Sequence, residues 1–398
     1  MNTPRLSKHL LYALGLAACS GAETQPATTR DSSGIEIVES WQPQWQAGDG
    51  WHLSADPILQ IGTADGPQEL QFHQIEGAIV LADGRVVVAN AGSGEIRFFG
   101  ESGGFLSSVG GLGDAPGEYR QITGIGTGPA DSLWVFDYGL RRFTVLTAAG
   151  EAVRTVSVGG TLSSAGAVGR LSDGSFVVKE SWSSHLHGGE RQGLVRDPVA
   201  VATLAADGSG LDTITTVAGR EVFVSTENGR AVMSAPLFAR TSSAAMGDDA
   251  VYVGDQAKFE IRRYSPDGML QQVVRVPDAD LRLTSAAVQQ LKDEILAREP
   301  EQRRAMMRQH LQEMALPPSK PAYSRLMIDG AGNIWAAEYA RYPAVPLTWT
   351  VFTQAGELLG EVPVPRWFNV LQIGVDWILG VGRDELDVEY VRSYRLLK

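Results

Sequence analysis

Residues 75–111 read IEGAIVLADGRVVVANAGSGEIRFFGESGGFLSSVGG, and they contain the clearest copy of a pattern that predicts the fold. Its apolar runs are separated by short turns, of which Asp83-Gly84 and Gly103-Gly104 are the clearest. Asp-Gly and Gly-Gly between alternating apolar runs predict β-hairpins, because glycine adopts positive φ angles without a steric penalty. The stretch therefore predicts two linked hairpins, which together make one four-stranded antiparallel sheet.

The same unit recurs along the chain. Each copy has a second strand that ends in an acidic or amide residue, and these strands are expected at residues 86–90, 133–137, 176–180, 251–255 and 334–338. A shorter copy near the C-terminus offers only three strands, at residues 370–373, 377–381 and 388–397. Repeats of two hairpins each are typical of β-propellers, in which every repeat forms one blade.

The N-terminal strand supplies what the last copy lacks. Leu59-Gln60-Ile61-Gly62 resembles a fourth strand that arrives before any first three. In a ring it can pair with residues 388–397, which removes a sheet edge that would otherwise invite aggregation. The sequence therefore predicts an all-β fold, a six-bladed β-propeller closed by an N-terminal strand, with a helical-hairpin insertion.

The helical hairpin is expected within an insertion at residues 278–321, where the strand pattern stops. Thr284 or Ser285 can cap a first helix, in which Leu291 and Ile295 recur at helical spacing. Pro300 suits the first turn of a second helix. Whether this hairpin covers the central pocket as a lid is left open by the sequence.

The first residues have the pattern of an export signal. Arg5 and Lys8 precede the short apolar run Leu10–Ala18, and Leu16-Ala17-Ala18-Cys19 resembles a bacterial lipobox. Nine apolar residues are too few to span a bilayer. The resemblance implies a signal peptide at 1–18, lipidation of Cys19 and a membrane contact through the lipid anchor only.

The residues after the cysteine set the expected domain boundaries. Residues 20–33 are rich in Ser, Thr, Ala and Gly and are expected to form a tether, within a tether and N-terminal arm at 19–50. The propeller is expected at 51–398. Ser20 beside the lipidated residue implies a position in the cell envelope, at the outer membrane of a Gram-negative bacterium.

Charge and cysteine content exclude some classes of partner and site. The formal net charge is −12, and no cluster of Lys and Arg reverses it locally, so we expect no nucleic acid partner. A single cysteine excludes an intramolecular disulfide and the usual cysteine-based zinc sites.

The repeat unit resembles NHL-type repeats. The segments Asp31-Ser32-Ser33-Gly34-Ile35 and Pro116-Gly117-Glu118-Tyr119 resemble the uncharacterised six-bladed propeller lipoproteins of environmental bacteria. This resemblance covers nearly the whole mature chain and implies the fold. It implies no particular activity, because propellers serve many unrelated functions.

Candidate ligand or metal residues lie where the second strands end: Asn90, Asp137, Glu180, Asp255 and Glu338. Carboxylates that face a central pocket could hold a divalent cation such as calcium, or a cationic ligand. In the structural alternative, each side chain accepts backbone N–H bonds within its own turn. His185 and His187, beside Glu190, are weaker metal candidates, because neighbouring glycines favour a solvated loop.

The insertions are expected on one face, since repeat proteins concentrate insertions on the binding face. The leading interpretation is a non-enzymatic propeller that binds a protein or small-molecule ligand there. The alternative is a metal-dependent hydrolase or lactonase acting in the central pocket, by analogy with gluconolactonase-like propellers, although no stretch here matches their motifs residue by residue.

Overall fold

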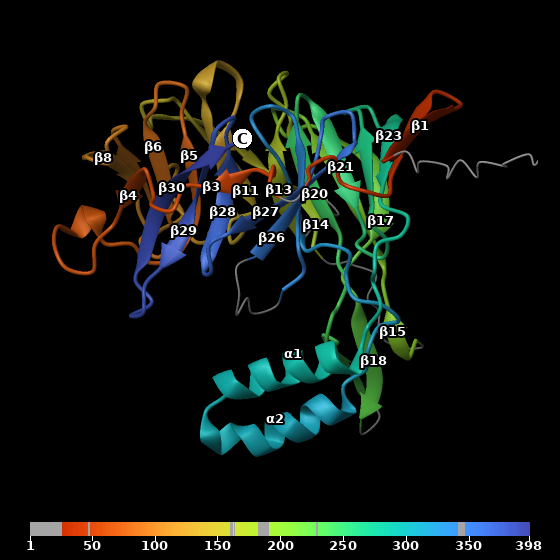
Figure 1. Cartoon of the computed structure of the whole chain (residues 1–398). Coiled ribbons are helices and arrows are strands. Elements are labelled where there is room, and N and C mark those ends of the chain that lie inside the picture. The colour runs from red at the N-terminus through yellow and green to blue at the C-terminus, as the bar shows by residue number, and fades with distance from the viewer. Residues whose placement is uncertain are drawn as a thin grey trace, which may run out of the picture.

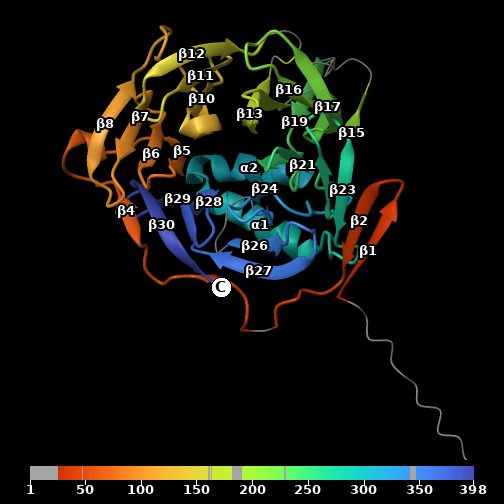
Figure 2. The same cartoon turned by 90° about the horizontal axis from the view of Figure 1, so that it is seen from above.

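The computed structural model describes residues 26–46, 48–159, 162, 164–181, 191–227, 230–340 and 347–398. These residues form mostly short strands, which build several small antiparallel sheets in a propeller-like arrangement. Figure 2 shows the sheets arranged around a common centre. Within the described residues, no helix is both long and apolar enough to cross a membrane.

Three sheets come from residues 75–218. The first sheet consists of β5 (Ile75–Val80), β6 (Val86–Asn90), β7 (Glu95–Phe99) and β8 (Phe105–Gly110). The second consists of β9 (Ile122–Thr127), β10 (Leu133–Asp137), β11 (Arg142–Leu146) and β12 (Ala152–Ser157). The third consists of β13 (Ala165–Arg170), β14 (Phe176–Glu180), β16 (Pro198–Leu204) and β17 (Leu211–Ala218).

Three further sheets follow. The fourth contains β20 (Ser243–Gly247), β21 (Ala250–Gly254), β22 (Glu260–Tyr264) and β23 (Leu270–Arg275). The fifth contains β24 (Arg325–Ile328), β25 (Ile334–Ala337), β26 (Leu347–Phe352) and β27 (Leu358–Val364). The sixth contains β28 (Phe368–Ile373), β29 (Trp377–Arg383) and β30 (Glu389–Leu397), with two N-terminal strands, β3 (His52–Leu53) and β4 (Leu59–Ile61).

The turns within each sheet follow from local residue choice. In the turn after β5, Gly84 has a φ angle of +85°. The Asp83 carboxylate there accepts the backbone N–H of Arg85 at 3.1 Å. An Asp side chain that bonds its own backbone two residues on stabilises such a turn, so the Asp-Gly pair sets both the bend and its register.

The second strands are the most buried part of each sheet. All residues of β6, β10 and β21 are buried, because neighbouring sheets cover both faces of these strands. An apolar cluster joins each sheet to the next along the chain. A further cluster joins the sixth sheet to the first, through Leu379 and Val391 on one side and Val88 and Phe99 on the other.

The N-terminal strand lies in the sixth sheet. In the register between β4 and β30, Ile61 is opposite Val391 and Gln60 is opposite Arg392. This is the pairing predicted for residues 57–62 and 388–397. Ile61 is 2% exposed, so its burial in the cluster between the sixth and first sheets favours this position.

One expectation about the N-terminal segment is wrong. Residues 27–32, expected within the tether, form β1 (Ala27–Ser32), which pairs with β2 (Ile35–Ser40). The two-residue loop Ser33-Gly34 has positive φ angles of 58° and 84°, which suit a tight hairpin. β2 then lies parallel to β23 and extends the fourth sheet, which buries Val38 completely.

The long insertions form a separate layer beside one face of the sheets (Figure 1). Two of them build a small sheet of β15 (Gly193–Val195), β18 (Val222–Glu227) and β19 (Arg230–Ser234). A third forms the predicted helical hairpin, α1 (Ser285–Arg298) and α2 (Glu301–Glu313), and Thr284 caps α1 by accepting the N–H of Ala287. Short 3-10 helices occur at Gln68–Leu70 and Pro129–Asp131.

The buried apolar residues of the hairpin pack on another insertion. Leu291, Ile295 and Leu311 are buried against Leu237 and Phe238. Figure 2 shows α1 and α2 lying across the centre of the sheet arrangement, and Figure 1 shows them beside β18, in the layer that the insertions form. The hairpin therefore lies over the centre of the sheet arrangement, on the face that carries the insertions.

Candidate functional site

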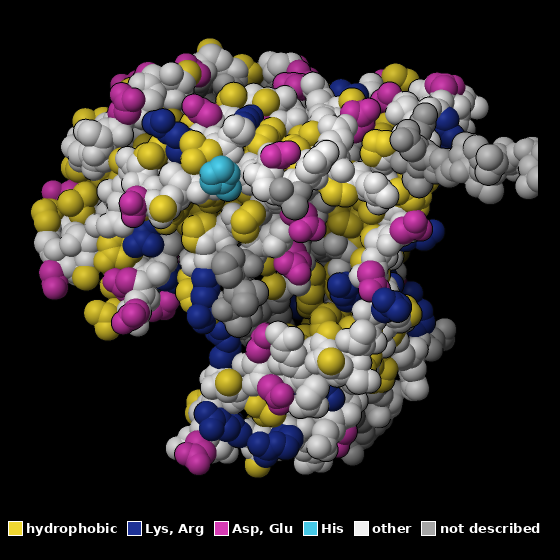
Figure 3. Space-filling view, in the orientation of Figure 1, with side chains coloured by type: hydrophobic (Ala, Val, Ile, Leu, Met, Phe, Trp, Pro, Cys, Tyr) yellow, Lys and Arg dark blue, Asp and Glu magenta, His cyan; other side chains and the backbone are white. Residues whose placement is uncertain are grey.

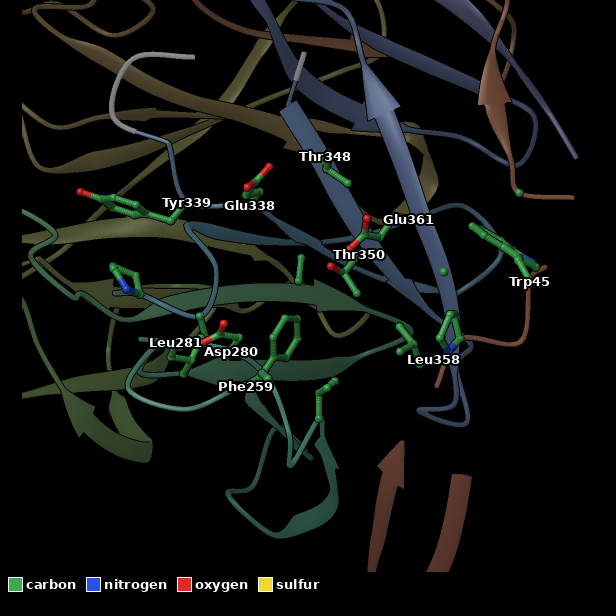
Figure 4. A pocket seen from close by; sticks show the side chains of 18 of the residues that line it. Trp45, Phe259, Asp280, Leu281, Glu338, Tyr339, Thr348, Thr350, Leu358 and Glu361 are labelled. Carbon is green, nitrogen blue, oxygen red and sulfur yellow. The ribbon is translucent and has the colours of Figure 1, made fainter. Parts of the chain in front are cut away.

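A cavity of about 740 Å³ opens on the insertion-bearing face, between the fourth and fifth sheets. We call it the cleft. Its lining includes Trp45, Phe259, Asp280, Leu281, Lys320, Glu338, Tyr339, Thr348, Thr350, Leu358 and Glu361. Figure 4 shows Phe259 and Asp280 on one side of the cleft and Glu338 and Glu361 on the other. The volume lies in the range of small-molecule sites.

One wall of the cleft is aromatic. Phe259 lies in the loop before β22, and its ring centroid is 5.3 Å from that of Tyr323 and 5.6 Å from that of Phe352. The Tyr323 hydroxyl donates to the backbone oxygen of Glu260 at 2.9 Å, which anchors this buried ring. The aromatic contacts hold Phe259 in place and so give the cleft one fixed apolar wall.

The N-terminal arm closes one end of the cleft. The backbone N–H of Trp45 donates to the carbonyl of Leu359 at 2.8 Å, and its ring lies against Gly360. A Cβ at Gly360 would stand 2.3 Å from Trp45 Cε3, and the φ angle of Gly360 is +158°. Glycine at this position therefore allows the indole to lie directly on β27.

The carboxylates of the cleft differ in their partners. Asp280 forms an ion pair with Arg282 at 2.7 Å, and this hydrogen-bonded partner lowers the pKa of Asp280. Glu338 and Glu361 have no such pair with a cation in the described part of the chain. Two carboxylates beside aromatic rings and threonine hydroxyls suit a ligand that carries a cationic group and an apolar body.

The predicted residues Asn90 and Asp137 are buried, and each forms hydrogen bonds with loops next to its own sheet. The Asn90 side chain accepts the backbone N–H of His73 at 2.8 Å and donates to the Ser93 hydroxyl at 2.7 Å. Asp137 accepts backbone N–H groups from Arg120, Gln121 and Leu140 at 2.7, 3.3 and 2.9 Å. Both arrangements have the form of the structural alternative, in which the residue caps local turns.

Glu180 and Asp255 also contact backbone N–H groups. Glu180 accepts from Ala200 at 2.9 Å, and Asp255 accepts from Ala257 at 3.0 Å. In the fourth sheet it is Gln256, the residue after Asp255, whose buried side chain accepts a backbone N–H from the preceding loop, as Asn90 and Asp137 do in their sheets. Its side chain, which is 1% exposed, accepts the N–H of Thr241 and donates to the carbonyl of Ser324.

Of the five predicted strand-end residues, Glu338 is the one that lines the cleft. Among the described residues, no group of three or more His, Cys, Asp and Glu side chains is arranged to hold a metal ion. Cys19, His185 and His187 lie outside the described residues. The sequence did not single out Asp280, Lys320 or Glu361, which also line the cleft.

Comparisons with known proteins describe the fold. No family model matches the sequence, and no curated protein matches it. A Bacteroides fragilis protein assigned as exported is similar in structure, with a TM-score of 0.50 and 10% identity over 91% of this chain and 100% of that chain. A member of the DUF4221 family from Bacteroides vulgatus gives a TM-score of 0.53 and 11% identity over 87% and 99%.

A gluconolactonase from Xanthomonas campestris is also similar, with a TM-score of 0.46 and 14% identity over 87% of this chain and 100% of that chain. The likeness to the two Bacteroides structures concerns the fold alone, because a shared fold at such low identity does not imply a shared activity.

Proposed function

We propose that this chain is a lipid-anchored, extracytoplasmic six-bladed β-propeller that binds a ligand on its insertion-bearing face. The architecture is the first step of the proposal. The first strands β5, β9, β13, β20, β24 and β28 contact one another in this order, and β28 contacts β5. Together with the apolar cluster between the sixth and first sheets, these contacts support a closed ring of six blades.

The observation that carries the binding function is the cleft itself. It combines a volume of about 740 Å³ with an aromatic wall and the two carboxylates Glu338 and Glu361. Asp280, the other carboxylate that lines the cleft, is paired with Arg282, so Glu338 and Glu361 are the carboxylates available to a ligand. The ligand class is an organic ammonium ion with an apolar body, and a divalent cation such as calcium is the other cation that such oxygens accept.

A titration of the detergent-solubilised full chain tests this function. Phenethylammonium is the probe, 2-phenylethanol is the uncharged control and calcium is measured in parallel by calorimetry. We expect phenethylammonium to bind at least about tenfold more tightly than the alcohol, because a desolvated cation gains from a carboxylate and a ring together. Equal affinity for both probes would refute the proposal.

Variants locate the binding. Glu338→Gln and Glu361→Gln remove one charge each from the cleft, and Glu101→Gln removes one from an exposed turn of the first sheet as the matched control. The two cleft variants are expected to weaken phenethylammonium binding by about fivefold or more, while the control leaves it unchanged. A loss in all three variants would show that net charge alone attracts the probe.

Metal analysis tests the enzymatic alternative. A metal-dependent hydrolase or lactonase retains a divalent ion in stoichiometric amount, so metal analysis of the purified chain distinguishes it from a binding protein. A stoichiometric ion that survives Glu338→Gln and Glu361→Gln would favour the enzyme in the central pocket over a ligand in the cleft.

The anchor is tested by fractionation. We expect the unaltered chain in the outer-membrane fraction, and we expect Cys19→Ala to release it, because the lipid adduct is lost. Retention of Cys19→Ala in the membrane fraction would contradict the lipoprotein assignment.

A further inference from the structure

A second cavity, of about 710 Å³, opens on the insertion-bearing face at the starts of the first strands. We call it the arginine pocket. Its lining includes Ile75, Arg298, Arg325, Leu347, Trp349, Trp367, Phe368, Val370, Val381, Arg383, Asp387 and Glu389. It shares no lining residue with the cleft. Figure 3 shows a hollow between the body and the helical hairpin, with Lys and Arg side chains gathered along its rim.

Arg325 is the central cation of this pocket. It begins β24, donates from Nη2 to the carbonyl of Val370 at 2.6 Å, and lies 5.3 Å from the centroid of the Trp349 ring. Burial lowers the pKa of Arg325 to about 10, and burial is the only cause of this shift. Among the described residues no carboxylate forms an ion pair with Arg325. A desolvated guanidinium in such a place is costly, and an anionic ligand would offset that cost.

The acidic residues of the pocket are already paired with another arginine. Arg383 bonds Asp387 at 2.9 Å and Glu389 at 2.6 Å. The second carboxylate oxygen of Glu389 accepts the backbone N–H of Ile75 at 2.9 Å. These bonds engage both carboxylates with Arg383 and the first sheet, so the guanidinium of Arg325 is the main charge that a ligand would meet.

Arg298 brings the helical hairpin to the pocket. It is the last residue of α1, and its guanidinium lies 5.1 Å from the centroid of the Trp367 ring. Trp367 is 40% exposed and has a φ angle of +60°, which is unusual for a bulky residue. This strained turn presents the indole toward the hairpin, so the insertion contributes a cation directly opposite the sheets.

We propose that the arginine pocket is a second binding site, which takes a small organic carboxylate with an apolar body. The guanidinium of Arg325 has the planar donor geometry that recognises a carboxylate, and Arg298 adds a second positive charge. Leu347, Phe368 and Val381 supply the apolar walls. This site goes beyond the cation-binding function proposed for the cleft and does not depend on it.

Calorimetry on the detergent-solubilised full chain tests the site with three probes. Cinnamate carries the carboxylate and an apolar body, methyl cinnamate is the same body without charge, and inorganic phosphate is an oxyanion without the body. We expect saturable cinnamate binding that is at least about tenfold tighter than that of either control, because only cinnamate satisfies both the guanidinium and the walls. Comparable binding of the ester, or tighter binding of phosphate, would overturn the proposed ligand class.

Three substitutions locate the probe. Arg325→Met keeps the apolar length of the side chain and is expected to weaken cinnamate binding by at least about tenfold. Arg298→Met, on an exposed helix end, is expected to weaken it by about threefold or more and remains informative if Arg325→Met fails to fold. Unchanged cinnamate affinity in either variant would overturn the proposal.

Arg170→Met is the matched control. Arg170 ends the first strand β13, donates to the carbonyl of Gly174 and lies 5.4 Å from the centroid of the Phe176 ring, so its surroundings resemble those of Arg325. It lines a different cavity, at the opposite ends of the first strands. Unchanged cinnamate affinity is expected, and a loss equal to that of Arg325→Met would show that binding does not occur in the arginine pocket.

Discussion

Replacing Asp137 by Asn should destabilise the protein, although the two side chains have the same shape. Asp137 is completely buried at the end of β10. One of its oxygens accepts the N–H of Arg120 at 2.7 Å, and the other accepts those of Gln121 and Leu140 at 3.3 and 2.9 Å. A carboxylate can accept all three bonds, whereas an amide has a single acceptor oxygen.

The size of the effect follows from this bond count. If the Asn oxygen keeps the bonds to Gln121 and Leu140, its NH2 group faces the N–H of Arg120, and both donors remain unsatisfied. A lost hydrogen bond to a charged buried acceptor costs about 1.5–3 kcal/mol. We therefore expect the free energy of unfolding to fall by about 2 kcal/mol, which lowers Tm by roughly 2–3 °C in a chain of this size.

Urea unfolding and calorimetry measure the effect, with and without calcium. Asp255→Asn is the matched control, because Asp255 is 39% exposed and makes one such bond, to Ala257. Its expected loss is below about 0.5 kcal/mol. Higher stability of Asp137→Asn, together with weaker calcium binding, would refute the capping role and indicate carboxylates that repel one another around a shared cation site.

Two further changes test other contacts. Burial lowers the pKa of Lys179 to about 8, below its ordinary value of 10.5. At pH values between these two, the unfolded state binds more protons than the folded state, so the free energy of unfolding rises with pH. Lys179→Met should abolish that rise, which urea unfolding at pH 7 and pH 10 measures. An unchanged pH dependence would contradict burial of the amine. Gly360→Ala places a Cβ 2.3 Å from Trp45 Cε3 and should lower Tm and change the tryptophan emission, whereas Gly166→Ala, whose Cβ meets nothing within 4 Å, should alter neither. Equal effects of the two would contradict the packing of Trp45.

Much of the sheet pattern could be predicted because each repeat carries its own turn chemistry. The expected strands at 86–90, 133–137 and 176–180 coincide with β6, β10 and β14. Thr284, one of the two expected caps, caps α1, and the expected Leu291 and Ile295 are its buried residues. These features depend on local signals, namely turn residues, apolar runs and a capping side chain, and such signals are present in a single sequence.

The elements that form between distant segments could not be predicted in the same way. The small sheet joins β15 to β18 and β19 across two separate insertions. The β1–β2 hairpin contains many Ser and Thr residues, so its composition resembled a tether, and its parallel pairing with β23 depends on a neighbour more than 200 residues away. Composition describes what a segment could do alone and says little about a partner strand.

The candidate site was predictable only at its strand ends. Glu338 follows β25 and was expected on this face, whereas Glu361 lies on β27 among alternating buried and exposed residues and looks like any solvent-facing side chain. Gln256 caps the fourth sheet from a position with a φ angle of +63°, directly after the expected Asp255. The capping side chain is thus one residue later than expected, because the backbone of that turn has a conformation that the sequence pattern does not reveal.

Closure of the proposed six-bladed ring is the central claim, and a cross-link between β4 and β30 tests it. Gln60 on β4 lies opposite Arg392 on β30, and Arg392 donates to the Gln60 side chain at 2.8 Å. In the Cys19→Ala background, Gln60→Cys with Arg392→Cys should form a disulfide within one chain under mild oxidation, read by mass spectrometry of the digested protein, because opposed residues on paired strands bring their Cβ atoms within reach. A cross-linked peptide joining the two strands is the predicted result; two free thiols in the folded, oxidised protein would contradict the closure of the ring.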